Sequence, residues 1–327
     1  MKKFISILLA LMLVMSLGTA AFAEGETYTD MRTVTITKNY EATNSGTVSP
    51  EETFTFTIVA RDVTDAAEGV NTGNMPLPTI EDVTYAAGEA GSVNKSKEIT
   101  ITLPEYNSVG IYTYTINENV GTTAGVEYYG ENILLKVTVI EQDGKVRVAA
   151  VHTEEGFNGN STDGTKSSKI TNIYSAGSLA VTKTVGGNLG DKSKYFEFKV
   201  TLTGEEGKTY AESFAVSGGS NNDNPKTIKI GEETTFLLKD GETISIANIP
   251  YNVTYTVTET AVEGYETTKT GDRGTINAAA QTAAFTNIKE GDIDTGISLD
   301  SLPYILMLVV VGAAIVVVST RKKGEQF

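Results

Sequence analysis

Two segments with strand periodicity, residues 112–118 and 253–259, each carry a glutamate where an apolar side chain is expected. Their sequences, YTYTINE and VTYTVTE, alternate between apolar and small polar side chains, which is typical of a strand with one buried face. The alternation places Glu118 and Glu259 on the apolar faces. Because a carboxylate is rarely buried without a partner, we expect each glutamate to meet a polar group inside a core.

Each half of the chain also carries a lysine and an asparagine on an apolar face. Residues 33–38 and 178–184 alternate so that a lysine shares a face with apolar side chains. Residues 169–174 and 283–288 do the same for an asparagine. The order lysine, glutamate, asparagine therefore occurs twice, as Lys38, Glu118 and Asn172, and as Lys183, Glu259 and Asn287.

These three groups can join two side chains covalently without a cofactor. An exposed lysine has a pKa near 10.4 and is too fully protonated at neutral pH to attack a carbonyl. Burial lowers an amine pKa by about 3–5 units and raises a carboxyl pKa, so a neutral amine and a protonated acid can meet. The amine would displace ammonia from the asparagine amide while the glutamate polarises the carbonyl and transfers the proton. We predict isopeptide bonds Lys38–Asn172 and Lys183–Asn287, with Glu118 and Glu259 as catalytic groups.

The alternative is that the six residues have separate surface roles. Lysine and glutamate at strand ends can extend toward water, and asparagine is common in turns. The matched order and facing in both halves favours the covalent interpretation. Since each bond would form once, within the chain, the reaction does not make the protein an enzyme.

Composition sets aside several other kinds of chemistry. Cysteine and tryptophan are absent and there is a single histidine, His152, so metal sites and histidine-based nucleophilic catalysis lack their usual residues. We therefore predict no metal site. The formal net charge of -15 argues against nucleic acid as a partner.

Both ends of the chain have the features of export and anchoring signals. Residues 1–23 combine two lysines, an apolar run and an A-x-A site, which is typical of a cleaved secretory signal peptide. Residues 302–320 are apolar and long enough for one bilayer crossing, and a basic cluster follows them directly. A retained N-terminal anchor and an ordinary single-pass membrane protein are the alternatives.

Between these ends the sequence indicates an all-β chain with two tandem immunoglobulin-like β-sandwich domains. Short alternating segments are separated by glycine, asparagine and aspartate, and the lysine-to-asparagine pattern repeats. We predict a first domain at 24–175, a second at 176–290, a hinge at 175–177 and a loop-rich insertion at 62–96. The predicted strands are residues 33–38, 53–59, 98–103, 111–118, 133–140, 146–152, 169–174, 178–184, 196–202, 227–230, 234–238, 243–246, 253–259 and 283–288.

The lysine on a first strand, the Y-x-[IV]-x-E segment and the Thr-Asn pair on a last strand resemble the collagen-adhesin B-type (CnaB-like) modules of Gram-positive surface proteins. Two such modules after a signal peptide resemble the major, or backbone, pilin of sortase-assembled pili. The resemblance implies a structural shaft subunit that is exported, transiently tethered to the membrane and then anchored to the cell wall. Residues 291–327 resemble a cell-wall sorting signal, which implies sortase cleavage between Thr295 and Gly296, although Asp292 and Ile293 replace the usual Leu-Pro.

In such pilins, sortase joins the threonine of one subunit to a lysine of the next, shortly before the bonding asparagine. By this resemblance the acceptor is Lys166, in a polar loop, or Lys169, which opens the following strand. The implied partners are sortase, neighbouring copies of the chain, and peptidoglycan or other pilins, with a host surface ligand left open. The alternative function is a monomeric wall-anchored adhesin, for which residues 62–96 are a candidate binding surface.

Overall fold

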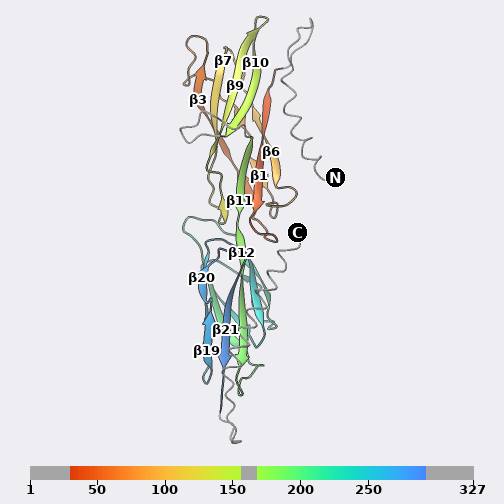
Figure 1. The fold of residues 1–327 in the computed structure, drawn as a ribbon, viewed down its shortest axis with the longest axis vertical. Helices are drawn as coiled ribbons and strands as arrows, with labels where there is room; N and C mark the ends of the chain where they lie inside the picture. Colours follow the sequence, from red (N-terminus) through yellow and green to blue (C-terminus); the bar gives the residue numbers. More distant parts are fainter. Residues whose placement is uncertain (1–29, 156–167, 292–327) are drawn as a thin grey trace, which may run out of the picture.

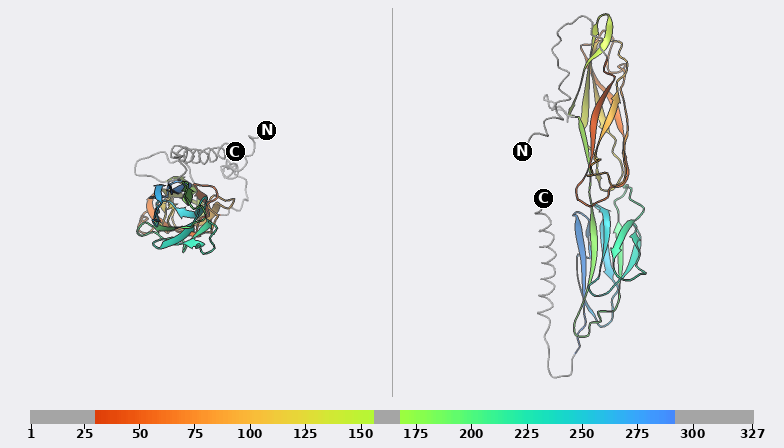
Figure 2. Two further views of the ribbon diagram at one scale, coloured as in Figure 1. Left: turned by 90° about the horizontal axis from the view of Figure 1, so that it is seen from below. Right: turned by 90° about the vertical axis from the view of Figure 1, so that its right-hand side faces the viewer.

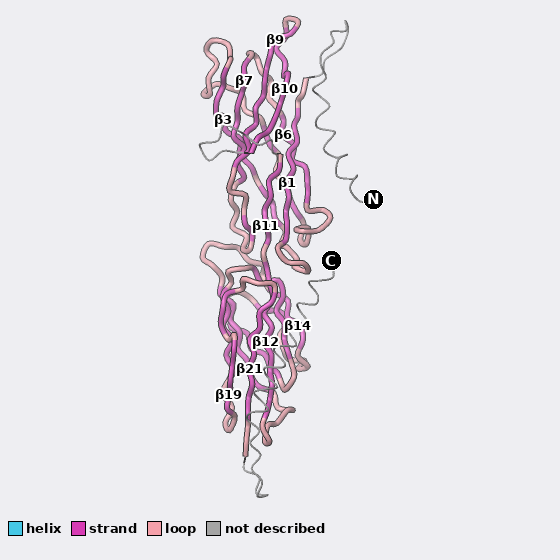
Figure 3. The backbone as a smooth tube through the Cα atoms, in the orientation of Figure 1, coloured by secondary structure: helices cyan, strands magenta, loops and turns pink. Residues whose placement is uncertain are grey.

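The structure, a computed structural model, describes residues 30–155 and 168–291, and the regular elements within these ranges are all strands (Figures 1 and 3). The predicted signal peptide, the sorting signal with Thr295 and Gly296, and Lys166 lie outside the described residues. Within the described ranges there is no helix of the length and apolarity needed to cross a membrane.

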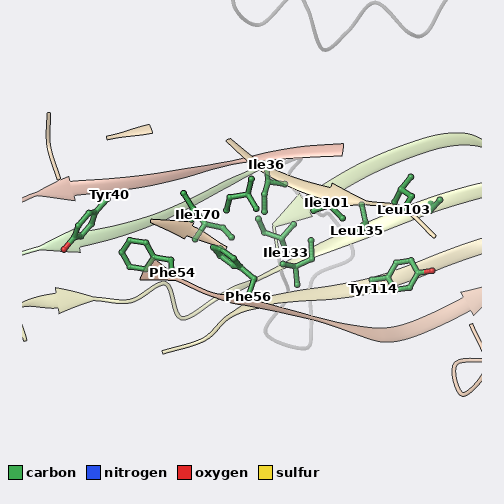
Figure 4. Close-up of a cluster of buried hydrophobic side chains, with 14 of the residues drawn as sticks. Ile36, Tyr40, Phe54, Phe56, Ile101, Leu103, Tyr114, Ile133, Leu135 and Ile170 are labelled. Carbon is green, nitrogen blue, oxygen red and sulfur yellow. The ribbon is translucent and has the colours of Figure 1, made fainter. Parts of the chain in front are cut away.

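The first domain packs two sheets face to face around an apolar core. One sheet has the order β4-β6-β1-β11-β8 and the other β10-β9-β7-β3, with β2 and β5 as a separate pair. Side chains from both sheets point toward each other in this core (Figure 4). The strands are β1 (Thr33–Ala42), β2 (Glu52–Phe54), β3 (Phe56–Thr64), β4 (Thr79–Ile80), β5 (Val83–Tyr85), β6 (Ser96–Thr102), β7 (Gly110–Glu118), β8 (Val126–Glu127), β9 (Asn132–Gln142), β10 (Lys145–Glu155) and β11 (Lys169–Tyr174).

The second domain repeats this arrangement with its own core. Its sheets have the orders β15-β14-β17-β12-β21-β19 and β16-β13-β18-β20. The strands are β12 (Ala176–Gly186), β13 (Phe196–Thr203), β14 (Phe214–Gly218), β15 (Thr227–Ile228), β16 (Glu233–Leu238), β17 (Thr243–Pro250), β18 (Thr254–Glu259), β19 (Glu266–Thr270), β20 (Arg273–Thr275) and β21 (Ala280–Ile288). The predicted all-β fold with two sandwich domains is confirmed.

The two domains lie end to end in an elongated rod (Figures 1 and 2). The predicted hinge at 175–177 is wrong, because Ala176 and Gly177 already belong to β12 and pair with β17, so that Ser175 alone separates β11 from β12. Hydrogen bonds cross the junction as well, from Asn44 Nδ2 to the Ala176 carbonyl (2.7 Å) and from the Ala124 N–H to the Thr209 carbonyl (2.9 Å).

In the first domain one predicted strand is divided, and the predicted insertion is part of the core. The predicted strand 53–59 is two strands, because β2 pairs with β5 while β3 pairs with β7 in another sheet. The predicted loop-rich segment 62–96 also contains the short strands β4 and β5, and its Met75, Val83 and Tyr85 are buried in the domain core. The Tyr85 hydroxyl donates a hydrogen bond to the Lys38 carbonyl (2.6 Å), so this segment packs directly over the strand that carries the lysine.

Candidate functional site

Strand register brings the lysine and asparagine of each domain onto neighbouring strands with the same offset. In the first domain β1 and β11 run parallel, with Lys38 opposite Ile170. In the second, β12 and β21 run parallel, with Lys183 opposite Phe285. In both cases the asparagine, Asn172 or Asn287, lies two positions further along, and residues two apart face the same side of a strand. Each pair therefore points into the core as diagonal neighbours.

The glutamate of each cluster comes from the opposite sheet. Glu118 ends β7 and Glu259 ends β18, and each reaches across the core. In the first domain Lys38 Nζ donates to Glu118 Oε2 at 2.7 Å, and Asn172 Nδ2 donates to Glu118 Oε1. The side chains of Lys38 and Glu118 are both 0% exposed. The carboxylate thus bridges the amine and the amide.

The second domain has the same cluster with different hydrogen bonds. Lys183 Nζ and Asn287 Nδ2 both donate to Glu259 Oε1, at 2.8 Å and 2.6 Å. The Lys183 and Glu259 side chains are 0% and 3% exposed. The other two oxygens, Glu259 Oε2 and Asn287 Oδ1, are buried and accept no hydrogen bond from any described residue.

Aromatic rings lie over both lysine amines. Lys38 Nζ lies 4.2 Å from the centroid of the Phe54 ring, and Lys183 Nζ lies 4.2 Å from that of Phe196. Burial lowers the pKa of Lys38 to about 8, although Glu118 acts in the opposite direction. Burial also lowers the pKa of Lys183, against the effect of Glu259. At a pKa of about 8, roughly a tenth of an amine is uncharged at neutral pH, far more than for an exposed lysine.

One functional contact of the first cluster comes from the backbone. The N–H of Tyr129, in the connection between β8 and β9, donates to Asn172 Oδ1 at 3.0 Å. The Asn172 amide is therefore held on both sides, its nitrogen by Glu118 and its oxygen by Tyr129. Patterns of side-chain polarity contain no signal for a backbone donor, so the sequence analysis missed it.

The remaining predicted site residues fall in two groups. Lys169, one of the two predicted acceptor lysines, is exposed at the start of β11. Lys166, Thr295 and Gly296 are outside the described residues, so their roles remain predictions. Among the residues that the structure describes, no group of three or more histidine, aspartate or glutamate side chains is arranged to hold a metal ion.

Both domains match family models, and the chain is similar to pilus proteins. Residues 34–175 match the family model FctA, described as a Spy0128-like isopeptide containing domain, and residues 177–289 match DUF7601, a domain of unknown function. The chain is 28% identical over 341 residues to a protein named "Pilin" from Streptococcus pyogenes serotype M1, covering 92% of this chain and 94% of that protein. It is 30% identical over 129 residues to the pilus tip adhesin Cpa of Streptococcus pyogenes, covering 37% of this chain and 18% of the adhesin.

Solved structures show the same fold. The major pilin from Streptococcus pyogenes has a TM-score of 0.51 and 24% identity, with 80% of this chain and 100% of that chain covered. A second major pilin from that species has a TM-score of 0.51 and 21% identity, with 80% and 99% covered. The first domain of the chain is therefore similar to the Spy0128-like isopeptide containing domains, and the chain is similar over nearly its whole length to a streptococcal pilin.

Proposed function

We propose that this chain is the structural shaft subunit of a covalently polymerised pilus, stabilised by isopeptide bonds Lys38–Asn172 and Lys183–Asn287. The observation that carries the proposal is the same buried cluster of lysine, glutamate and asparagine in each of two domains arranged in line. An unreacted buried ion pair contributes little to stability, because desolvation offsets its attraction. Two such clusters with one register offset therefore support a chemical role.

The proposed reaction needs only the three side chains. Lys38 transfers a proton from Nζ to Glu118, and the neutral amine attacks Cγ of Asn172, whose amide donates to the same carboxylate. Glu118 then passes its proton to Nδ2 and takes a second proton from Nζ. The Cγ–Nδ2 bond breaks, ammonia leaves, and an amide joins Nζ to Cγ. Each cluster reacts once and leaves the chain changed, so the protein is not an enzyme in the ordinary sense. The three side chains supply all the chemistry, so the reaction requires no cofactor.

The proposed bonds create an unbroken covalent path along the rod. It runs from β1 through the first bond to β11, continues directly into β12, and passes through the second bond to β21. The strands outside this path need not bear tension applied to the ends. Such a path suits a surface fibre that is pulled, and it cannot be reduced as a disulfide can.

Subunits would be joined by sortase from Thr295 of one copy to Lys166 or Lys169 of the next. This would place the protein on the cell surface, anchored to the wall, beside further copies of itself and other pilins. The similarity to both a pilin and a pilus tip adhesin of Streptococcus pyogenes supports this setting.

Expression of the chain with its sortase tests the shaft role. We expect a ladder of high-mass species on denaturing gels that is absent without the sortase and is lost with Lys166→Ala. Lys229→Ala, which changes an exposed lysine in the second domain, is the matched control and should leave the ladder intact. A single band in the presence of active sortase would instead identify a monomeric wall-anchored adhesin. A ladder that is retained with Lys166→Ala but lost with Lys169→Ala would identify Lys169 as the acceptor.

A further inference from the structure

The two clusters differ at the amide oxygen that becomes negatively charged during the reaction. When the amine attacks Cγ, negative charge develops on the asparagine Oδ1. In the first domain the Tyr129 N–H already points at this atom, at 3.0 Å from Asn172 Oδ1. In the second domain Asn287 Oδ1 is buried and accepts no hydrogen bond from a described residue. The first cluster alone has a donor placed for an oxyanion.

We propose that the backbone N–H of Tyr129 is the oxyanion donor for the Lys38–Asn172 bond, and that this bond consequently forms faster than the Lys183–Asn287 bond. The inference rests on the isopeptide chemistry proposed above. A fixed donor aimed at a developing oxyanion typically accelerates acyl transfer by about 10²–10³-fold. In the first domain, the Tyr129 N–H therefore stabilises the negative charge on Asn172 Oδ1, while Glu118 transfers the protons.

Strand pairing explains why the donor is available in one domain only. The pairing of β8 with β11 ends at Glu127 opposite Ile173, one residue short of Asn172. Tyr129 lies past the end of this ladder, so its N–H can turn toward the asparagine side chain. In the second domain β19 pairs with β21 through Thr267 opposite Asn287 and continues to Thr270 opposite Ala284. There the neighbouring strand runs past the asparagine in regular pairing.

Contacts made by this connection and by the segment just before β8 hold the Tyr129 donor in place before the reaction. The neighbouring Tyr128 hydroxyl donates to Glu52 Oε1 at 2.7 Å, and the Thr123 hydroxyl donates to Glu52 Oε2. On the other side, the Ala124 N–H bonds the Thr209 carbonyl of the second domain at 2.9 Å. A donor fixed in this way requires no reorganisation as charge develops, which is the condition for strong electrostatic stabilisation.

The rates of the two bonds can be measured separately in one molecule. Unbonded full-length chain is recovered from inclusion bodies, refolded by dilution and quenched in acid at intervals, and the cross-linked peptide of each domain is quantified by mass spectrometry. Circular dichroism reports when folding is complete, so that later changes are chemical. In the wild-type chain we expect Lys38–Asn172 to form about 10²-fold faster than Lys183–Asn287. Equal rates, or a faster second bond, would overturn the inference without any variant.

Replacing Tyr129 with its α-hydroxy acid analogue changes the backbone N–H to an ester oxygen and keeps the side chain. We expect the Lys38–Asn172 bond to slow by about 10²–10³-fold while the second bond keeps its rate. Tyr129→Phe, which retains the N–H, is the control and should match the wild type. An unchanged first rate in the ester variant would refute the role of Tyr129 alone. Failure of either bond to form in the wild type would refute the proposed function itself.

Discussion

Asn172→Ala is expected to lower the free energy of unfolding of the first domain by on the order of 5 kcal/mol, the entropy associated with closing a loop of this length in the unfolded chain. Lys38 and Asn172 lie 134 positions apart in the sequence, so the proposed bond closes most of the domain. The substitution removes the bond but keeps the Lys38–Glu118 ion pair. Urea unfolding of the wild type and the variant, monitored by circular dichroism, measures the difference.

The control for this change is Asn39→Ala. Asn39 is the next residue on β1 and lies outside the lysine cluster. Its Nδ2 donates to the Thr171 hydroxyl at 3.3 Å, and its Oδ1 accepts from the Ser96 hydroxyl at 2.8 Å. Loss of these two hydrogen bonds should cost about 2 kcal/mol, at about 1 kcal/mol for each. Equal destabilisation by Asn172→Ala and Asn39→Ala would show that no cross-link was lost.

The stability of the Asn172→Ala variant should depend on pH, because its Lys38 remains a buried amine. In the unbonded first domain the pKa of Lys38 is about 8, below its unfolded value of 10.5, so the unfolded state binds more protons between these values. Stability of Asn172→Ala should therefore rise with pH from about 8 to 10. In the bonded protein the nitrogen is an amide and does not titrate. The difference in free energy of unfolding between wild type and variant should therefore narrow from pH 8 to 10. The buried tyrosines are common to both proteins, so their effect cancels in this difference.

If the difference in free energy of unfolding stays constant from pH 8 to 10, the variant does not contain a buried, unreacted Lys38 amine. The stability lost by Asn172→Ala at neutral pH could then not be assigned to loss of the Lys38–Asn172 bond. Measurement of both proteins in the same buffers makes this comparison direct.

Mechanical extension is the second large effect. Pulling the wild-type rod from its ends should lengthen neither domain, because both proposed bonds bypass the intervening chain. Glu259→Ala should prevent the second bond and release the 104 positions between Lys183 and Asn287. At ~3.3–3.6 Å per residue, unfolding of that domain should add on the order of 350 Å to the contour length. Single-molecule force spectroscopy measures this increment.

Glu263→Ala is the matched control, since Glu263 is an exposed glutamate four residues beyond the cluster. It should remain inextensible like the wild type. Extension of the wild-type second domain by the full increment would mean that Lys183 and Asn287 are not joined.

The facing of the polar residues could be predicted because strand periodicity is strict. Lys38, Glu118 and Asn172 each follow the alternation of their apolar neighbours, and all three are buried together in the structure. Periodicity within one strand does not show which lysine, glutamate and asparagine belong together. The same order of the three residues in both halves indicated that grouping. The common register offset of two residues became visible only in the folded sheets.

The failures have local physical causes. Phe54 and Phe56 keep the same alternation across the break between β2 and β3, so the change of sheet leaves no mark in the pattern. The expected hinge contains small residues because the chain is closely packed there, not because it is flexible. A Cβ on Gly177 would lie 2.1 Å from the Ala278 carbonyl oxygen. The strands that were not predicted are mostly very short, such as β4 and β8, and the fully exposed β19 has no apolar alternation to detect.

The intact mass of the purified exported fragment, residues 24–295, tests the central claim most directly. Two isopeptide bonds predict a mass lower than the sequence mass by two ammonias, with Glu118→Ala and Glu259→Ala each restoring one. The full sequence mass in the folded wild-type fragment would contradict the account, because both lysines would then have remained free amines beside unreacted asparagines.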